Sequence, residues 1–330
     1  MTSQDAAQDL FVGVDVGGTK VAVGLVTAQG EIAASVRRPM VADGDEAAGL
    51  ASVIGSIDAL FAANPKASET IPGIGICAPG PLDPSTGVVI NPPNLKCWRN
   101  FPLATEISRH YDIPVKIDND ANAAALAEVL WGAGRGYKNV FYACIGTGIG
   151  TGIIFDGHIY HGRTGAAAEG GHVSIDYNGP VCGCGKRGCI EVLASGTAIA
   201  RRAREKLAAE PARGAALRDL AWGRLESVSG EMVGRAHAAG DALATEVLIE
   251  TAELLAVWLG NTVDLLEPDV MILGGGAAAL LRPFFDEIRQ RMARHCVNSR
   301  YMEVPLVPAF YGADSGIAGG AALCTRAEKR

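Results

Sequence analysis

Three of the eight cysteines crowd into one short, glycine-rich segment: Cys182, Cys184 and Cys189. His172 lies ten residues before the first of them. Three thiolates and one imidazole form the closed tetrahedral ligand set of a structural zinc site, which leaves no open position for catalysis at the metal. The alternative is three free thiols in a loop, but their density favours metal binding. The spacing therefore predicts one structural zinc ion.

Two glycine- and threonine-rich turns each lie between apolar, β-rich runs, and a third glycine cluster follows a later apolar run. Backbone N–H groups in such turns converge on an anion, and the missing side chains let a phosphate approach closely. Asp15, at a strand end, is a candidate ligand for Mg²⁺. Ordinary hairpin turns are the alternative, but the recurrence favours a nucleotide. The candidate nucleotide-binding residues are Asp15, Gly17, Gly18, Thr19, Lys20, Gly146, Thr147, Gly148, Gly274, Gly275 and Gly276.

Two common phosphate motifs do not account for these turns. The chain contains no G-x-x-x-x-G-K-[S/T] sequence. Its one G-x-G-x-x-G run, residues 183–188, lies inside the cysteine segment and follows no predicted strand. A dinucleotide-binding fingerprint requires a preceding strand. The sequence therefore predicts neither a P-loop nor a Rossmann site.

Several carboxylates lie in positions that suit acid–base chemistry or hydroxyl binding. Glu169 and Glu191 flank the metal segment, where a rigid loop would hold them for hydrogen bonds to a polyol; an ordinary solvated role is the alternative. Asp118 and Asp120 lie between a predicted strand and a predicted helix. A carboxylate there can cap the helix or act as a general base, and capping alone is the alternative.

The elements that would position these residues follow from periodicity and turn signals. The two hairpins are followed by similar segments, Gln-Gly-Glu-Ile at 29–32 and Asp-Gly-His-Ile at 156–159. This similarity indicates a weak internal repeat of two α/β halves, for which chance is the alternative. We predict strands at 10–26 (as a hairpin), near 32, and at 74–78, 114–117, 140–145, 153–155 and 269–273, and helices at 46–63, 118–130, 195–207, 243–266 and 315–326.

Composition limits the class of protein. The chain has 330 residues, is 48% hydrophobic and carries a net charge of −7, so it has a sizeable core and lacks the basic patch of a nucleic-acid-binding protein. Its 42 glycines follow no collagen period. Residues 1–9 show no secretory signal, and no apolar run of about 18 residues lacks charges or glycine clusters. We therefore expect a cytoplasmic protein without a membrane span.

Together these motifs resemble the ROK family of sugar kinases, within the hexokinase–actin ATPase superfamily. Within the family the chain is most similar to the bacterial glucokinases, partly through the Asn-Pro-Pro-Asn-Leu run ending at Leu95 and through Trp98. One departure is Ala168, where many relatives carry glycine. The resemblance extends over nearly the whole chain and rests on residues 15–20, 78–83, 119–122, 146–152, 169–172, 182–191 and 274–276.

The resemblance implies an α/β fold of two ribonuclease H-like domains around a deep cleft. Residues 1–117 with 312–330 would form the small domain, and residues 118–311 the large one. ATP with Mg²⁺ would bind at the hairpins, with adenosine near Gly274–Gly276. Asp120 matches the catalytic base of the family, and His172 would bind zinc through one ring nitrogen and sugar through the other. The implied sugar contacts are Gly80, Asn94, Asn119, Asp120, Glu169, His172 and Glu191.

The resemblance implies transfer of the ATP γ-phosphoryl group to the 6-hydroxyl of a hexose, with glucose the expected acceptor. Kinases for fructose, mannose, allose and N-acetylhexosamines share the same motifs, and polyphosphate is an alternative donor. Sugar-sensing repressors of the family carry an N-terminal helix-turn-helix, for which residues 1–10 leave no room in this chain. Relatives are dimers or tetramers, so a homo-oligomer is expected.

Overall fold

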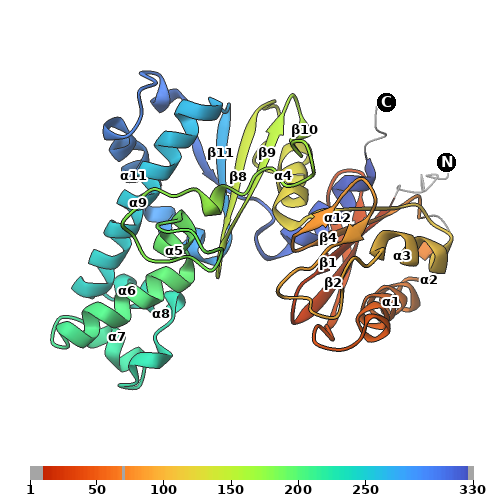
Figure 1. Ribbon diagram of the computed structural model, residues 1–330, viewed down its shortest axis with the longest axis horizontal. Coiled ribbons are helices and arrows are strands. Elements are labelled where there is room, and N and C mark those ends of the chain that lie inside the picture. The colour runs from red at the N-terminus through yellow and green to blue at the C-terminus, as the bar shows by residue number, and fades with distance from the viewer. Residues whose placement is uncertain (1–9, 69–70, 326–330) are drawn as a thin grey trace, which may run out of the picture. The chain divides into compact units, whose positions relative to one another are not determined.

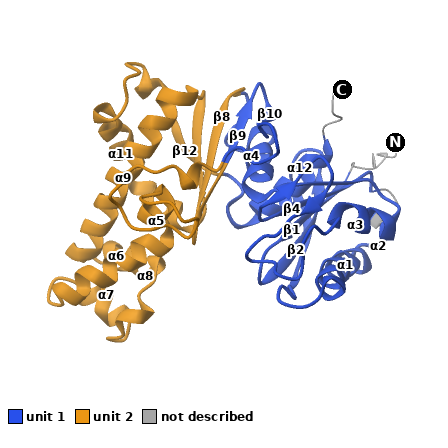
Figure 2. Ribbon diagram, viewed as in Figure 1, with its two compact units in different colours: residues 1–136, 152–168, 310–330 blue, residues 137–151, 169–309 orange. Residues whose placement is uncertain are grey.

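The structure, a computed structural model, describes residues 10–68 and 71–325, which form two compact units (Figure 1, Figure 2). Unit 1 takes in the chain up to 136, residues 152–168, and the chain from 310 on. Unit 2 takes in residues 137–151 and 169–309. The expectations for residues 1–9 and for Arg326 lie outside the described residues.

Unit 1 is built on a sheet of five strands in the order β3-β2-β1-β4-β7. The first three strands in the chain pair antiparallel, whereas β1, β4 and β7 are parallel. Its elements are β1 (Leu10–Val16), β2 (Lys20–Thr27), β3 (Ile32–Pro39), α1 (Glu46–Ala63), α2 (Pro65–Ser68), β4 (Ile74–Ala78), β5 (Leu82–Asp83), β6 (Val88–Val89), α3 (Leu103–Tyr111), β7 (Val115–Asn119), α4 (Asp120–Leu130), β10 (His158–Ile159) and α12 (Ser315–Thr325).

The alternating side chains of this sheet build two separate cores. Val12 and Val14 of β1 join one core with Val53 and Ile57, which lie one helical turn apart on α1. Cys77 of β4 faces the other way, into a core formed with residues of α4 and α12. The sheet of unit 1 is therefore covered on both faces, which leaves the ends of its strands as the place for a site.

Among the described residues, α1 alone has the length and apolar composition to cross a membrane. The core helix of a globular domain meets the same criterion. Residues along one side of α1 are buried, and the helix packs against β2 and β3. The contacts of α1 are therefore those of a core helix.

Unit 2 contains a second set of parallel strands, β8, β11 and β12, and most of the helices after residue 169. The long helix α9 packs against α5, α6, α8 and α11. Its elements are β8 (Val140–Ile145), α5 (Ile190–Ala194), α6 (Gly196–Ala209), α7 (Ala215–Leu220), α8 (Gly230–Ala238), α9 (Ala242–Leu266), β11 (Val270–Gly274), α10 (Gly276–Leu281), α11 (Phe285–Arg291) and β12 (Leu306–Pro308). One boundary between the two units lies within β9 (Ile149–Phe155).

The internal repeat predicted from the two hairpins is confirmed by sheet topology. The second sheet has the order β10-β9-β8-β11-β12, so both sheets follow the order 3-2-1-4-5 when their strands are counted along the chain. Both begin with a glycine-rich hairpin. The sequence similarity of the two hairpins therefore marks a repeated α/β topology.

One predicted turn is too long. The second turn was expected over residues 146–152, but β9 already begins at Ile149. Glycine in a strand permits close approach of another backbone. A Cβ atom on Gly152 would lie 2.6 Å from the carbonyl oxygen of Ala121. Gly152 therefore serves the packing of β9 against α4, and the turn itself is short.

The compact units do not follow the domain limits expected at 117/118 and 311/312. The helix α4 packs on α12, and β7 pairs with β4. These contacts hold residues 118–136 in unit 1. The Asp118–Asp120 turn and the cysteine segment, which were expected in one domain, thus belong to different units.

Candidate active site

The carboxyl ends of three parallel strands meet at one edge of the unit 1 sheet. The register aligns Asp15 of β1 with Cys77 of β4, and Cys77 with Asp118 of β7. In open α/β sheets, ligands bind outside the carboxyl ends of the strands. The structure therefore brings the candidate magnesium ligand and the candidate catalytic turn to the same edge of one sheet.

Asp15 lies partly buried at the end of β1. The thiol of Cys77 donates to the carbonyl oxygen of Gly316, at 3.2 Å, and to Asp15 Oδ1, at 3.8 Å. Burial raises the pKa of Asp15, and the positive charge of Lys20 opposes that shift. Burial and the charge of Asp15 raise the pKa of Cys77 well above its usual range. A nearby divalent cation would stabilise the ionised carboxylate, so Asp15 fits a magnesium site.

The first glycine-rich turn lies against the segment that carries Asn94. A Cβ atom on Gly18 would lie 2.8 Å from the carbonyl oxygen of Asn94. Gly80 is similarly close to the catalytic turn, because its Cβ position lies 3.5 Å from Asn119 Nδ2. These four candidate residues are therefore neighbours in two pairs within unit 1. In this turn Gly17 and Gly18 are half-buried, whereas Thr19 and Lys20 are exposed.

The two aspartates that the sequence left open occupy different environments. Asp118 is buried, and its Oδ1 atom accepts hydrogen bonds from Asn119 N, at 2.7 Å, and from Asn122 Nδ2, at 3.0 Å. Asp120 is exposed, and its Oδ1 atom accepts from Ala121 N at 2.8 Å. The N-cap of α4 is Asn119, whose side chain also accepts from Ala121 N. Asp118 is therefore not the cap, and Asp120 is the aspartate that is exposed to solvent.

The second hairpin of the chain adjoins the N-terminus of α6. Gly196 N donates to Gly146 O at 2.8 Å, and Thr197 Oγ1 donates to Thr147 O at 2.8 Å. Ser195 caps the helix. The sequence analysis did not single out Thr197, although a serine cap followed by glycine and threonine is a signal for an anion-binding helix start. These two bonds hold the second hairpin against the start of α6.

The third glycine cluster lies beside the end of β8. Gly274 pairs in register with Cys144. Gly275 has a φ angle of 88°, and a Cβ atom there would lie 2.5 Å from the carbonyl oxygen of Ile145. Only glycine tolerates both the left-handed backbone and this approach. The second hairpin and the glycine cluster are thus neighbours within unit 2, as a nucleotide site requires.

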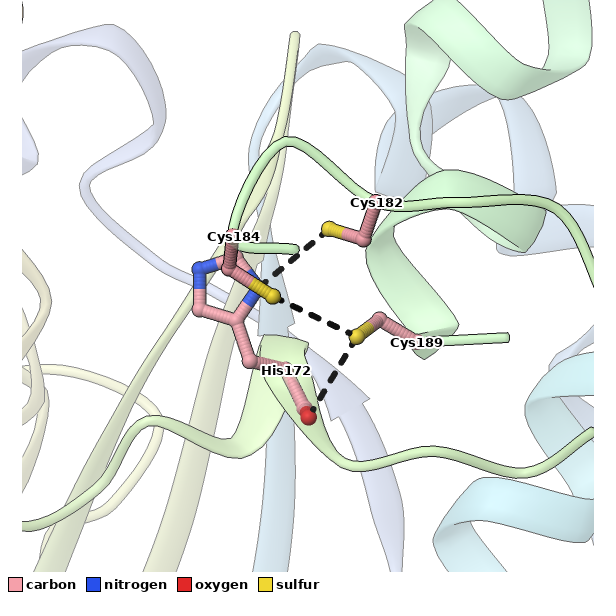
Figure 3. Close-up of side chains that lie close together, drawn as sticks. All are labelled: His172, Cys182, Cys184 and Cys189. Carbon is pink, nitrogen blue, oxygen red and sulfur yellow. Dashed lines mark hydrogen bonds between the residues drawn. The ribbon is translucent and has the colours of Figure 1, made fainter. Parts of the chain in front are cut away.

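The structure brings the four predicted metal ligands together (Figure 3). Their ligand atoms all lie within 4.8 Å of one another. Cys182 Sγ lies 3.6 Å from His172 Nδ1, and Cys184 Sγ lies 3.7 Å from Cys189 Sγ. Zn–S bonds of about 2.3 Å at tetrahedral angles place sulfur ligands about 3.8 Å apart. The donor set and its spacing fit a zinc ion.

The protonation of these thiols depends on their different surroundings. Burial raises the pKa of Cys182 and raises that of Cys189 to about 12. The backbone N–H of Lys186 lowers the pKa of the exposed Cys184. Metal binding requires thiolates and releases their protons. All eight cysteines of the chain are free thiols, so no disulfide competes for these three.

Glu191 links the metal segment to the second hairpin. Its Oε2 atom accepts from Ile149 N at 2.9 Å, and its Oε1 atom lies 3.9 Å from His172 Nδ1. Glu169 is exposed, and its carbonyl oxygen accepts from His172 N at 3.0 Å. The Nδ1 atom of His172 faces the thiols, and the other ring nitrogen points away from them (Figure 3). The imidazole therefore has one nitrogen for a metal and one for another ligand.

The candidate sugar contacts divide between the two units. In unit 1 they are Gly80, Asn94, Asn119 and Asp120, and in unit 2 they are Glu169, His172 and Glu191. Within unit 1 the contacts join Gly80 to Asn119, whereas Asn94 contacts Gly18. Within unit 2, His172 contacts both Glu169 and Glu191.

Two α/β units with one repeated sheet order, each beginning with a glycine-rich hairpin, define the actin–hexokinase type of fold. The ROK family pattern matches residues 11–327. The chain therefore belongs to the ROK family.

Comparisons with individual proteins agree. The chain is 33% identical over 325 residues to a glucokinase of Thermotoga maritima, covering 95% of this chain and 96% of that one. The crystal structure of a ROK family glucokinase from Streptomyces griseus, in complex with glucose and AMPPNP, aligns with a TM-score of 0.78 at 34% identity over 95% of this chain and 98% of that one. A xylose repressor of Caldicellulosiruptor bescii is 32% identical over 72% of this chain but only 57% of its own length.

Proposed function

We propose that the protein is an ATP-dependent hexose 6-kinase with glucose as its acceptor. The observation that carries this proposal is the exposed Asp120 carboxylate, at the strand edge that also holds Asp15. The similarity to bacterial glucokinases over nearly the full length of both chains supports the same activity. The reaction converts glucose and ATP to glucose 6-phosphate and ADP.

Asp120 acts as the general base in this proposal. It accepts the proton of the sugar 6-hydroxyl as that oxygen attacks the γ-phosphorus. Asp118 is buried and already accepts hydrogen bonds, so it is a poor candidate for the same role. Phosphoryl transfer depends mainly on positioning and on electrostatic stabilisation of the phosphate. The base must therefore be held in place as well as be reachable.

The sugar contacts of this proposal are those expected from the family resemblance. Glu169 and Glu191 accept hydrogen bonds from its hydroxyls, and Asn119 accepts or donates, together with Gly80 and Asn94. His172 donates or accepts through the ring nitrogen that points away from the thiols. With Nδ1 on the metal side, the tautomer and ring orientation of this imidazole are fixed.

The nucleotide binds at the glycine-rich turns, with adenosine near Gly274 and Gly276. Backbone N–H groups of both hairpins hold the phosphates. Asp15 is the residue of this chain that would hold Mg²⁺, which neutralises phosphate charge when it is bound. We further propose one structural zinc ion at His172 and the three clustered cysteines, where it would hold the sugar-contacting loop rigid.

A hexose panel tests the proposed function. ADP release is measured with ATP or polyphosphate as donor and with glucose, fructose, mannose, allose or N-acetylglucosamine as acceptor. We expect ADP release that depends on hexose, with the highest kcat/KM for glucose. A higher kcat/KM for another hexose would reassign the acceptor. Hexose binding without any ADP release would indicate a sugar sensor. The similarity of the chain to a xylose repressor makes this the alternative function to test.

We propose a cytoplasmic homo-oligomer. The eight free thiols suit a reducing compartment. Analytical ultracentrifugation of the purified chain measures the assembly, and we expect a dimer or a tetramer.

A further inference from the structure

His161 makes a close contact with the turn that carries Asp120. Its Nε2 atom lies 2.6 Å from Asp118 Oδ2. The Asp118 side chain is 3% exposed and that of His161 is 37% exposed, so the imidazole covers a buried carboxylate. An ionised carboxylate only accepts hydrogen bonds. His161 Nε2 is therefore the donor, and this contact selects the tautomer or charge state that carries a proton on Nε2.

The Asp118 carboxylate fastens both ends of the catalytic turn. Its Oδ1 atom accepts from Asn119 N, at 2.7 Å, and from Asn122 Nδ2, at 3.0 Å. Asp120 lies between these two residues. The Asp118 carboxylate therefore joins two points of the turn through Oδ1, and His161 holds its other oxygen.

The imidazole comes from a different part of the chain. His161 follows β10, in a segment closed by a hydrogen bond from Ala167 N to His161 O, at 3.2 Å. Both His161 and Asp118 line a groove of about 1300 Å³ within unit 1, and His158 lines the same groove. The segment after β10 thus reaches the turn that carries Asp120 through the contact of His161 with Asp118.

We propose that His161 and Asp118 form a positioning pair that holds Asp120 in its working orientation for proton abstraction. This inference rests on the proposed function. The pair does not touch substrate; it acts through the backbone of Asn119 and the side chain of Asn122. Loss of the donor frees the carboxylate to rotate, and a displacement of about 1 Å at a reacting group costs up to about a hundredfold in rate.

Four variants test the pair: His161→Ala, His161→Gln, His158→Ala and Asp120→Asn. We expect His161→Ala to lower kcat by about ten- to a hundredfold, with glucose affinity by calorimetry near that of the parent. His161→Gln keeps an amide donor near the Nε2 position and should restore most of kcat. His158→Ala is the matched control, because this exposed ring lines the same groove and bonds to the carbonyl oxygen of Asp156, at 3.0 Å.

A double variant separates positioning from general destabilisation. In the Asp120→Asn background, His161→Ala should cause little further loss of kcat, because groups that act as a unit are not additive. An equal loss in both backgrounds, or no loss in the parent, overturns the positioning pair while the base assignment stands. A fully active Asp120→Asn variant overturns the assignment of the base, and the pair with it.

Discussion

The two sheets of this protein share one strand order but differ in what their parallel strands carry at the carboxyl ends. In unit 1 the aligned ends hold Asp15 and Asp118 beside the buried Cys77. In unit 2 the corresponding ends hold Gly274 in register with Cys144. The same framework therefore serves two kinds of chemistry. Unit 1 supplies carboxylates, and unit 2 supplies bare backbone and a thiol-rich loop.

This comparison predicts that variants in unit 1 change the chemical step and that variants in unit 2 change ligand binding and stability. The largest effect is expected for Asp120→Asn, because a general base is needed only while the hydroxyl loses its proton. We expect kcat to fall by about 10²–10⁴-fold, with a much smaller change in glucose binding. Initial rates of ADP release and calorimetry with glucose measure the two quantities.

Asp112→Asn is the matched control for this variant. Asp112 is an exposed residue in the left-handed conformation at the end of α3, with a φ angle of 55°, where asparagine is tolerated. We expect its kcat to match that of the parent. Equal losses in both aspartate variants, or a near-parental rate for folded Asp120→Asn, would contradict the assignment of chemistry to Asp120.

The second effect concerns the metal segment of unit 2. We expect Cys184→Ser to lose zinc, measured by elemental analysis of the purified protein, and to lose activity together with it. The physical reason is that only three ligands remain without the Cys184 thiolate, and three ligands do not complete the tetrahedral site. Cys296→Ser is the control, since this thiol bonds to Asp264, at 2.9 Å, away from the ligand set. Full activity in a zinc-free protein would remove the structural role of the metal.

The contrast between the units also explains what the sequence could predict. The ligands of the metal segment are close in sequence, so their spacing alone predicted the cluster that the structure assembles around His172. The strands of the hairpins and the helix α1 were predictable because their patterns are local. Most element ends shifted by one or two residues; for example, the strand expected at 114–117 is Val115–Asn119. The start of β9 shifted further, since this strand begins at Ile149 and was expected from 153.

The long-range contacts were not predictable from the sequence. His161 lies in a segment rich in glycine and polar residues, and nothing in its neighbours indicates a bond to Asp118, 43 residues earlier. The sequence likewise could not tell which aspartate is buried. The compact units differ from the expected domain limits for the same reason, since the packing of α4 on α12 joins segments that are far apart in the sequence. Ala168, noted as a departure from glycine, has a φ angle of 65°, which explains the usual preference.

A third prediction tests the close backbone approach in unit 2. Gly275→Ala places a methyl group 2.5 Å from the Ile145 carbonyl oxygen on a left-handed backbone. We expect the free energy of unfolding to fall by about 1–3 kcal/mol and the KM for ATP to rise. For stability, Gly276→Ala is the matched control, because a Cβ atom there meets nothing within 4 Å. Equal stability of the two variants in urea denaturation would contradict the close packing of the glycine cluster.

The smallest predicted effect concerns Glu128 of α4, a fully buried carboxylate in unit 1 that touches no candidate ligand. Its oxygens accept from Ala133 N, at 2.8 Å, Phe310 N, at 2.8 Å, and Tyr311 N, at 3.1 Å. It thereby joins the segment after α4 to the segment before α12. Burial raises the pKa of Glu128 above its ordinary value of 4.5, although these three N–H groups oppose the shift.

Glu128→Gln removes one acceptor and the charge together. We expect the free energy of unfolding to fall by about 1–2 kcal/mol, because one buried backbone N–H then faces the side-chain NH2 group, which does not accept hydrogen bonds. A raised pKa in the folded state means that ionisation favours the unfolded chain, so the parent loses stability as the pH rises above 4.5, whereas the variant has no such titration. The difference in the free energy of unfolding between parent and variant, measured by urea denaturation, should therefore become smaller from pH 4.5 towards neutrality.

Glu106→Gln is the control, because it breaks an exposed ion pair with Arg109. This variant should show neither the loss of stability nor the change of that loss with pH. A stability difference for Glu128 that instead widens with pH would mean that the three N–H groups outweigh burial and that the ionised carboxylate stabilises the fold.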